Sequence, residues 1–307
     1  MSNVKIGIVG LGNISQKVYL PFLCKEENWS LIGAYSPTKS KRRKICNQYR
    51  INEFSNLTDL LENCDAVFVN SSTDSHFEVV SEAIKKHKDV YVDKPLASSL
   101  DETEQLVELS IKNNRKLMVG FNRRFAPMYV EAKNNINSTT SLIRLEKHRI
   151  DSIRSENFKT TLLDDYIHLV DTARWLDEPN DCVDGFININ DKKELIFAEH
   201  SYKSKEDIKI FFDMHRKCGT NLERLEIITK DSIIRVKDMN TMEIEKEGKI
   251  EINKPSPWET AIKIKGFENA ILHFINSIIG NTKPIVDGVE GLKSQKLLND
   301  IINARNN

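Results

Sequence analysis

The chain has 307 residues, 39% of them hydrophobic and 29% charged, and its 45 basic side chains balance 45 acidic ones. This length predicts two domains, and the zero net charge argues against a large nonspecific nucleic-acid or membrane-surface field. No apolar run approaches the ~20 residues that span a bilayer, the first residues lack signal-peptide features, and the five cysteines are scattered without a CxxC pair. We therefore expect a cytoplasmic protein with reduced thiols and no metal centre.

The first 121 residues alternate between short apolar runs and amphipathic stretches. Strand-like runs occupy residues 4–9, 31–35, 66–70, 90–92 and 116–121, and helical patterns between them include 75–85 and 100–113. Apolar strands separated by helices predict a parallel sheet covered on both faces. We therefore assign residues 1–121 to a Rossmann-type doubly wound domain.

A glycine motif, Gly10-x-Gly12-x-x-Ser15, follows the first strand-like run and opens a helical pattern. Gly10 permits a tight turn, and Gly12 lets the backbone approach a pyrophosphate at a helix N-terminus. Such a motif alone is weak evidence, but its place after the first strand of a βαβ array is the required context. The pattern predicts NAD(P) phosphates near Gly10, Gly12, Asn13 and Ile14; the alternative is a glycine turn without a ligand.

The end of the second strand-like run, in GAYSPTKSKRRK, bears on the choice of cofactor. NAD-binding proteins usually place an acidic residue here for the ribose 2′-hydroxyl. This chain offers Ser36, Thr38 and Lys39, and hydroxyls and cations suit a 2′-phosphate. The segment therefore favours NADP over NAD, although a basic run is often only a solvated helix face.

Asp93, Lys94 and Pro95 follow the strand-like run at residues 90–92. In a doubly wound sheet, ligands bind beyond the carboxyl ends of the strands. Proline fixes the backbone, and a Lys-Pro bond is a candidate cis peptide that would direct the lysine side chain. Lys94 is thus a candidate for acid–base chemistry; the alternative is an exposed lysine in a turn.

The pattern changes beyond residue 121. A helical pattern at 162–176 precedes strand-like runs at 185–190, 194–202, 208–215, 222–229 and 233–237, and helical patterns at 266–279 and 289–304 end the chain. Successive strands with few helices predict an α+β domain with an open, mostly antiparallel sheet. We assign residues 122–307 to this domain, with the possibility that the last helix packs on the first domain.

The helical pattern at 162–176 carries acidic residues around a histidine. Asp164, His168 and Asp171 stand at i, i+4 and i+7, on one helix face. Two carboxylates flanking a histidine can fix its tautomer. A metal site would use the same residue types, but no further ligand pattern appears, and a surface helix with a satisfied histidine is the other alternative. The four-residue spacing favours Asp164 over its neighbour Asp165.

The junction motif GFNRRF, residues 120–125, adds three polar candidates. Asn122 can donate and accept hydrogen bonds at a cofactor amide or a substrate hydroxyl. Arg123 and Arg124 could bind substrate or pair with carboxylates. We favour the structural role, because most arginines are exposed or paired, and retain Arg123 as a candidate substrate contact.

The segments GLGNIS, DKP, GFNRRF and D-x-x-x-H with a further aspartate three residues later resemble, in this order, the Gfo/Idh/MocA oxidoreductases. The resemblance covers essentially the whole chain. More closely, VDKPLA, MVGFNRRFAP and TLLDDYIHLVDTARWL look like the MviM/YceM-type branch. The resemblance implies a Rossmann domain, an α/β domain whose open sheet commonly forms dimer or tetramer interfaces, and NAD(P)-dependent hydride transfer on sugars, cyclitols or related compounds.

The resemblance also implies roles for single residues. Lys94, Asp164 and His168 correspond to residues that line the substrate in relatives, where the histidine or the lysine moves the proton. On this basis Lys94 and His168 are the expected proton-transfer and polarising groups, and Asp164 is the expected orienting group.

Several positions depart from the family pattern. Asp93 stands where the family usually has glutamate, and Ser72 begins the pair that replaces the common Pro-Asn, while His76 is in place. We expect Ser71, Ser72, His76 and Asp93 on the cofactor side. Tyr166 replaces a frequent glycine, and the resemblance implies that it could fill part of a sugar pocket.

Together these patterns predict an NAD(P)-dependent oxidoreductase that transfers hydride between nicotinamide and a hydroxyl or carbonyl carbon of a sugar, cyclitol or related small molecule. One alternative is an NADP-binding sensor without turnover. Another is a redox-assisted glycosidase or lyase, which reduces and reoxidises its cofactor within one turnover. We expect a homodimer or homotetramer through the C-terminal sheet, and neither nucleic acid nor membrane as a partner.

Overall fold

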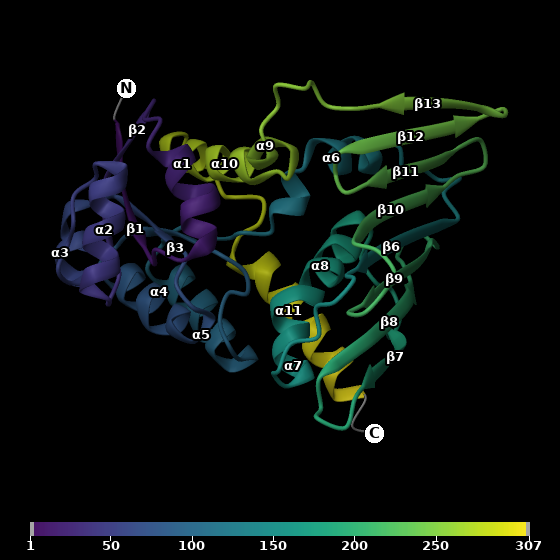
Figure 1. Ribbon diagram of the computed structural model, residues 1–307, viewed down its shortest axis with the longest axis horizontal. Coiled ribbons are helices and arrows are strands. Elements are labelled where there is room, and N and C mark those ends of the chain that lie inside the picture. Colours follow the sequence, from purple (N-terminus) through teal and green to yellow (C-terminus); the bar gives the residue numbers. More distant parts are fainter. Residues whose placement is uncertain (1–2, 305–307) are drawn as a thin grey trace. The chain divides into compact units, whose positions relative to one another are not determined.

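The computed structural model describes residues 3–304, which form two compact units (Figure 1). Within the described range, unit 1 holds residues 3–121 and 268–293, and unit 2 holds residues 122–267 and 294–304. Residues 268–293 therefore cluster with unit 1, whereas the sequence pattern grouped them with the second domain. Aromatic packing explains this, because Phe274 lies edge-on to Phe68 and Tyr91 of unit 1.

Unit 1 is built on a five-stranded parallel sheet with the strand order β2-β1-β3-β4-β5, which confirms the predicted Rossmann-type fold. The strands are β1 (Val4–Val9), β2 (Trp29–Tyr35), β3 (Ala66–Val69), β4 (Asp89–Val92) and β5 (Leu117–Val119). The helical segments are η1 (Ser15–Tyr19), α1 (Leu20–Leu23), α2 (Lys39–Tyr49), α3 (Leu57–Asn63), η2 (Thr73–Ser75), α4 (His76–Lys85), α5 (Leu100–Lys112) and α10 (Phe267–Ile279).

Because helices cover both faces of this sheet, its central strands are buried and apolar throughout. Every residue of β3 and β4 is buried. Tyr19 of η1 packs against Phe68 and Tyr91 on one face, and Leu60 of α3 fills the space above Gly7 on the other. The chain returns from β2 across β1 to β3, so the carboxyl ends of β1 and β3 flank the topological switch point.

Unit 2 contains an eight-stranded sheet with the order β13-β12-β11-β10-β6-β9-β8-β7. Strands β6 and β9 pair in parallel and the other neighbours are antiparallel, which confirms the predicted mostly antiparallel sheet. The strands are β6 (Leu142–His148), β7 (Asp184–Ile189), β8 (Leu195–Lys203), β9 (Lys209–His215), β10 (Leu222–Ile228), β11 (Ile233–Lys237), β12 (Thr241–Lys246) and β13 (Lys249–Asn253). The helical segments are η3 (Asn122–Phe125), α6 (Pro127–Asn134), α7 (Phe158–Thr161), η4 (Leu162–Tyr166), α8 (Ile167–Leu176), α9 (Ala261–Ile264) and α11 (Gly288–Ala304), which begins in unit 1.

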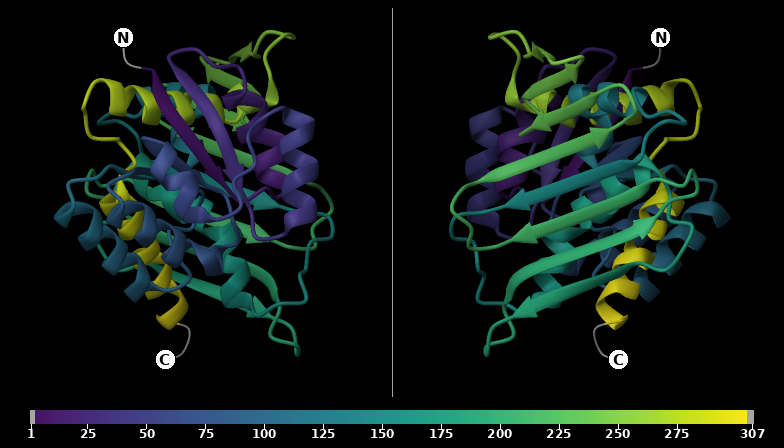
Figure 2. Two further views of the ribbon diagram at one scale, coloured as in Figure 1. Left: turned by 90° about the vertical axis from the view of Figure 1, so that its left-hand side faces the viewer. Right: turned by 90° about the vertical axis from the view of Figure 1, so that its right-hand side faces the viewer.

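The two faces of this larger sheet differ. Helix α8 packs against β6 and β9 on one face, where Leu145, Phe212 and Leu225 are buried. In the right-hand view of Figure 2 the opposite face of the strands is turned to the viewer with no helix in front of it. We call this the open face. It carries rows of charged side chains, among them Arg144 and Glu146.

Among the elements of unit 2 that were not predicted from the sequence are strands β6, β12 and β13 and helix α6. In β6 the sequence LIRLEKH places charged residues on the open face and so lacks a continuous apolar run. Among residues 3–304, no helix combines the length and apolarity needed to cross a bilayer.

Candidate active site

The glycine turn after β1 lies at the switch point of the unit 1 sheet. Gly10 has φ +89°, and a Cβ there would lie 2.4 Å from the backbone nitrogen of Ser71, so only glycine fits between β1 and β3. A Cβ at Gly12 would meet nothing within 4 Å. This open space beside a helix start fits the close approach of a dinucleotide pyrophosphate.

The helix that follows the turn starts irregularly. Asn13 is exposed and Ile14 half-buried in its first turn, and residues Ser15–Tyr19 then form a π-helical segment. Ser15, at the third glycine position of the motif, is fully buried against the sheet. The Gln16 side chain donates to the carbonyl of Leu11 at 3.0 Å and braces the turn from within the helix. π-Helical segments are frequent at functional sites.

The end of β2 presents the residues predicted near the adenosine ribose. Ser36 is buried, whereas Thr38 and Lys39 are exposed at the start of α2. Arg42 donates to the Ser36 carbonyl at 2.7 Å and to Glu53 at 3.0 Å, so its charge stabilises this loop. Lys39 lines a surface hollow whose other lining residues are Ser40, Arg43, Lys44 and Asn47.

Lys94 lies half-buried just beyond the carboxyl end of β4, in a cis peptide with Pro95. Asp93 accepts a hydrogen bond from the Lys94 backbone N–H at 2.9 Å. The buried ring of His76 places Nδ1 2.9 Å from the Pro95 carbonyl oxygen and Nε2 3.3 Å from that of Ser71. Burial lowers the pKa of His76, so a neutral ring donates to one of these carbonyls and links the loops after β3 and β4.

Unit 1 thus gathers its predicted residues at the carboxyl edge of one sheet. Ser71 and Ser72 follow β3, Lys94 follows β4, and the glycine turn follows β1. The neighbouring Ser71 and Ser75 hydroxyls are joined at 2.7 Å. This edge presents backbone N–H groups, hydroxyls and one lysine, a donor set that suits a phosphorylated cofactor.

In unit 2 the adjacent acids Asp164 and Asp165 have different environments. Asp164 is partly exposed and pairs with Arg154. Asp165 is bound by Lys147 of β6 and by Arg216, whose side chains are almost completely buried. Although burial opposes ionisation, these two cations hold the pKa of Asp165 well below its usual range. Burial in turn lowers the pKa of Lys147 to about 8.

The two acids lie in an irregular helical segment that precedes α8. Residues Leu162–Tyr166 form a π-helical segment, and α8 begins only at Ile167. His168 is half-buried in the first turn of α8. Asp171, the second acid on the predicted stripe, is 1% exposed. Arg124 donates to it at 2.7 and 3.0 Å and the Ser294 hydroxyl at 2.7 Å, so this carboxylate anchors α8 to η3 and α11.

The polar atoms of three further predicted residues form hydrogen bonds or ion pairs within the protein. Asn122 is buried and donates from Nδ2 to the Lys265 carbonyl at 2.8 Å. Arg123 forms a buried bidentate pair with Glu223 at 2.6 and 2.9 Å, the structural arrangement favoured from the sequence. Tyr166 is fully buried. Its hydroxyl lies 2.7 Å from Nδ1 of His200 and 3.1 Å from the Phe212 carbonyl.

Sequence reasoning missed the partners of the two acids. Arg154, Lys147 and Arg216 lie outside the helical pattern that suggested the site, so spacing could not associate them with it. One signal was present: Lys147 alternates with outward-facing Glu146 and His148, and a lysine at an inward strand position needs a buried partner.

These features define a class: an oxidoreductase that binds NAD(P) on a Rossmann unit and carries a second, α+β unit. A family model for the oxidoreductase family with an NAD-binding Rossmann fold matches residues 4–121, and a model for the YceM-like C-terminal domain matches residues 127–247. The chain belongs to the Gfo/Idh/MocA oxidoreductases with a YceM-like C-terminal domain.

Individual relatives agree with this assignment. The chain is 40% identical to the oxidoreductase YceM of Salmonella typhimurium over 300 residues, 97% of each chain. The crystal structure of the dehydrogenase MviM from Clostridium difficile superposes with a TM-score of 0.94 at 46% identity, covering 98% of this chain and 99% of that one. An inositol 2-dehydrogenase/D-chiro-inositol 3-dehydrogenase of Shouchella clausii is 27% identical over 182 residues, 56% of this chain and 53% of that protein.

Proposed function

We propose that the protein is an NADP-preferring dehydrogenase or reductase that acts on a CH–OH or carbonyl group of a sugar, cyclitol or related polyol. The observation that carries the proposal is the shared edge of the unit 1 sheet, where Lys94 stands two strands from an open glycine turn. The kinship with an inositol dehydrogenase supports the substrate class.

The preference for NADP rests on the end of β2. No acidic side chain stands among Ser36, Thr38 and Lys39, and α2 starts here without a side-chain cap. A helix N-terminus with uncapped N–H groups and a nearby ammonium attracts a phosphate more than a neutral hydroxyl. We therefore infer that this segment holds the 2′-phosphate of the adenosine ribose.

The chemistry assigned to the chain's own residues is proton handling and polarisation. When bound, the nicotinamide accepts or supplies a hydride at C4. In the oxidative direction His168 takes the hydroxyl proton while the C–H electron pair leaves as hydride, so a carbonyl forms; in reduction His168 returns the proton. Lys94 polarises the same oxygen, and Asp164 orients the histidine. Arg123 and Tyr166 are left out of these steps, because their polar atoms are bound to Glu223 and His200.

The test combines turnover with cofactor binding. A panel of polyols and the matching ketones is screened for formation or loss of reduced nicotinamide absorbance. With an active substrate, Lys94→Met and His168→Ala should abolish turnover and keep the cofactor-induced rise in melting temperature. Unchanged turnover in both variants would refute the role assignment, and product formation without net reduced cofactor would indicate a redox-assisted lyase or glycosidase.

The adjacent acids supply a matched pair for the same assay. Asp164→Asn should lower turnover with little change in stability, because Asp164 and its partner Arg154 are about 40% exposed. Asp165→Asn should lower stability, because it leaves Lys147 and Arg216 without their buried anion. The reverse result would move the catalytic role to Asp165.

We also propose that the protein assembles as a homodimer or homotetramer through the open face of the unit 2 sheet. Its support is the absence of a covering helix on that face within the described residues and the exposure of Phe186 and Ile252, both above half. Light scattering coupled to size-exclusion chromatography tests it; a monomer at all concentrations would refute it.

A further inference from the structure

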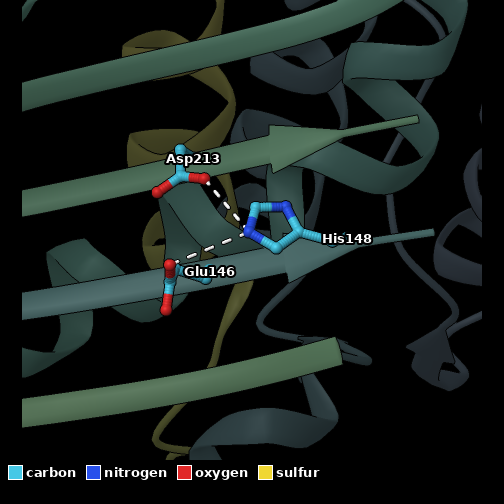
Figure 3. A group of neighbouring side chains, drawn as sticks. All are labelled: Glu146, His148 and Asp213. Carbon is cyan, nitrogen blue, oxygen red and sulfur yellow. Dashed lines mark ion pairs between the residues drawn. The ribbon is translucent and has the colours of Figure 1, made fainter. Parts of the chain in front are cut away.

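Three potential metal ligands lie on the open face of the unit 2 sheet, and Figure 3 shows their side chains turned toward one another. Glu146 and His148 are two residues apart on β6, so they share a face. Asp213 is in register with Glu146 on the parallel neighbour β9. The topology of the sheet therefore brings an imidazole and two carboxylates together from segments 65 residues apart.

The distances suit one small cation. His148 Nε2 lies 3.5 Å from Asp213 Oδ1 and 3.8 Å from Glu146 Oε1, and all three donor atoms lie within 4.8 Å of one another. Zinc bound at its usual ligand distances holds tetrahedral donors about 3.4 Å apart. Small side-chain rotations would bring these atoms to that separation, and water would complete the coordination.

The environment of the Asp213 carboxylate also favours a bound cation. The residue is 8% exposed, yet among the hydrogen bonds of residues 3–304 none reaches its carboxylate. Its nearest cationic or potentially cationic atoms are His148 Nε2 at 3.5 Å and Arg144 Nε at 3.9 Å. Buried carboxylates normally accept hydrogen bonds or bind cations.

Glu146 and Asp213 differ in their surroundings. Arg224 binds Oε2 of Glu146, so Oε1 faces the histidine. A hollow of about 350 Å³ adjoins Asp213, and its lining includes Arg144, Glu199 and the ring of Phe186. Of the three potential ligands, Asp213 lines this hollow.

Two features oppose the binding of a cation. Arg144 and Arg224 add positive charge nearby. Nδ1 of His148 accepts a long 3.3 Å hydrogen bond from the backbone N–H of His215, whereas a metal on Nε2 requires the ring proton on Nδ1. That contact would have to open. The tautomer of His148 with its proton on Nε2, facing the two carboxylates, is therefore the competing arrangement.

We propose that Glu146, His148 and Asp213 form a site for a divalent transition-metal ion of the Zn²⁺ type. Mixed nitrogen and oxygen donors favour Zn²⁺ over Mg²⁺ or Ca²⁺, which prefer oxygen alone. The site lies on the sheet face opposite α8, so its role is in stability or assembly rather than at His168.

Co²⁺ and Zn²⁺ titrations of the chelator-treated, full-length protein test the proposal, with Mg²⁺ and Ca²⁺ for comparison. We expect saturable Co²⁺ binding with visible ligand-field bands and no thiolate charge-transfer band, and displacement of Co²⁺ by Zn²⁺. His148→Gln and Asp213→Asn should weaken binding at least tenfold. Asp213→Asn should fold normally, because it removes a poorly compensated buried charge.

Matched controls come from the same face. His215 is in register with His148, and Glu226 pairs with Arg235 outside the cluster. His215→Gln and Glu226→Gln should bind the metal as the unaltered protein does. Absence of saturable binding, a thiolate band that places the ion on a cysteine, or full affinity in both His148→Gln and Asp213→Asn would each overturn the proposal.

Discussion

Gly12 offers a direct test of whether the turn after β1 holds the cofactor phosphates. A Cβ at this position meets nothing within 4 Å and the backbone is not left-handed, so Gly12→Ala adds no strain. Replacing glycine by alanine at a compatible site stabilises a protein by about 0.4–1 kcal/mol through the unfolded state. We expect the melting temperature without cofactor to be unchanged or to rise by no more than about 3 °C.

Cofactor binding should respond in the opposite direction. The added methyl group occupies the space through which a pyrophosphate would approach the backbone. A tenfold loss of affinity corresponds to about 1.4 kcal/mol. At a cofactor concentration 100 times the original Kd, the stabilisation by ligand would then fall from about 2.7 to about 1.4 kcal/mol. Thermal-shift titration with NADP measures both quantities in one experiment.

Two other glycines serve as controls for this experiment. Gly219, in unit 2, also has open space around a Cβ, so Gly219→Ala should raise stability by no more than about 1 kcal/mol and leave cofactor affinity unchanged. Gly10→Ala should destabilise the protein itself, because its Cβ would lie 2.4 Å from the Ser71 backbone nitrogen at a φ of +89°. If Gly12→Ala binds NADP as tightly as the unaltered protein, the turn is not the phosphate cradle.

Three further predictions concern charge. Arg124→Met leaves the buried Asp171 carboxylate without its cation and should lower the free energy of urea unfolding by about 3–5 kcal/mol. The double variant with Asp171→Asn should recover part of this loss. Equal losses in the single and double variants would contradict the reasoning. Although burial opposes ionisation, Arg123 lowers the pKa of Glu223 from 4.5 to about 2. This stabilisation is therefore complete above about pH 4.5 and lost as the pH falls towards 2. Glu223→Gln should be less stable at neutral pH, and its free energy of unfolding should depend less on pH between about 4.5 and 2. Parallel pH profiles would refute this. Lys39→Ala should weaken NADP about tenfold (about 1.4 kcal/mol) and NAD hardly at all, with the exposed Lys41→Ala as control; equal loss for both cofactors would remove the 2′-phosphate assignment.

The parallel sheet could be predicted because strands buried on both faces appear in the sequence as continuous apolar runs. In β3 and β4 every residue is buried, so apolar runs and intervening helices were enough. Strand β6 has no such signature, because its outward positions carry Arg144, Glu146 and His148 while its inward positions include Lys147. Charge on both faces hides a strand from a search for apolar periodicity, even at the centre of a sheet.

The acid–histidine segment shows a different limit. The spacing argument assumed 3.6 residues per turn, but residues Leu162–Tyr166 are π-helical. A wider turn changes the phase of every later side chain relative to the earlier ones. Spacing could therefore select Asp164 and His168 as candidates, but it could not show that Asp165 turns inward to Lys147, or that Asp171 is anchored by Arg124.

Strand β6 connects these observations. Its side chains alternate, so Lys147 points inward to Asp165 of the π-helical segment while Glu146 and His148 point to the open face. A slip of one residue in the pairing of β6 would exchange these faces, burying a glutamate and a histidine beneath α8 and leaving Asp165 with Arg216 alone. The Lys147–Asp165 ion pair on one face and the placement of Glu146 and His148 on the other therefore require the same register of β6. Because Asp164 adjoins Asp165, this register also determines where the proposed orienting carboxylate stands.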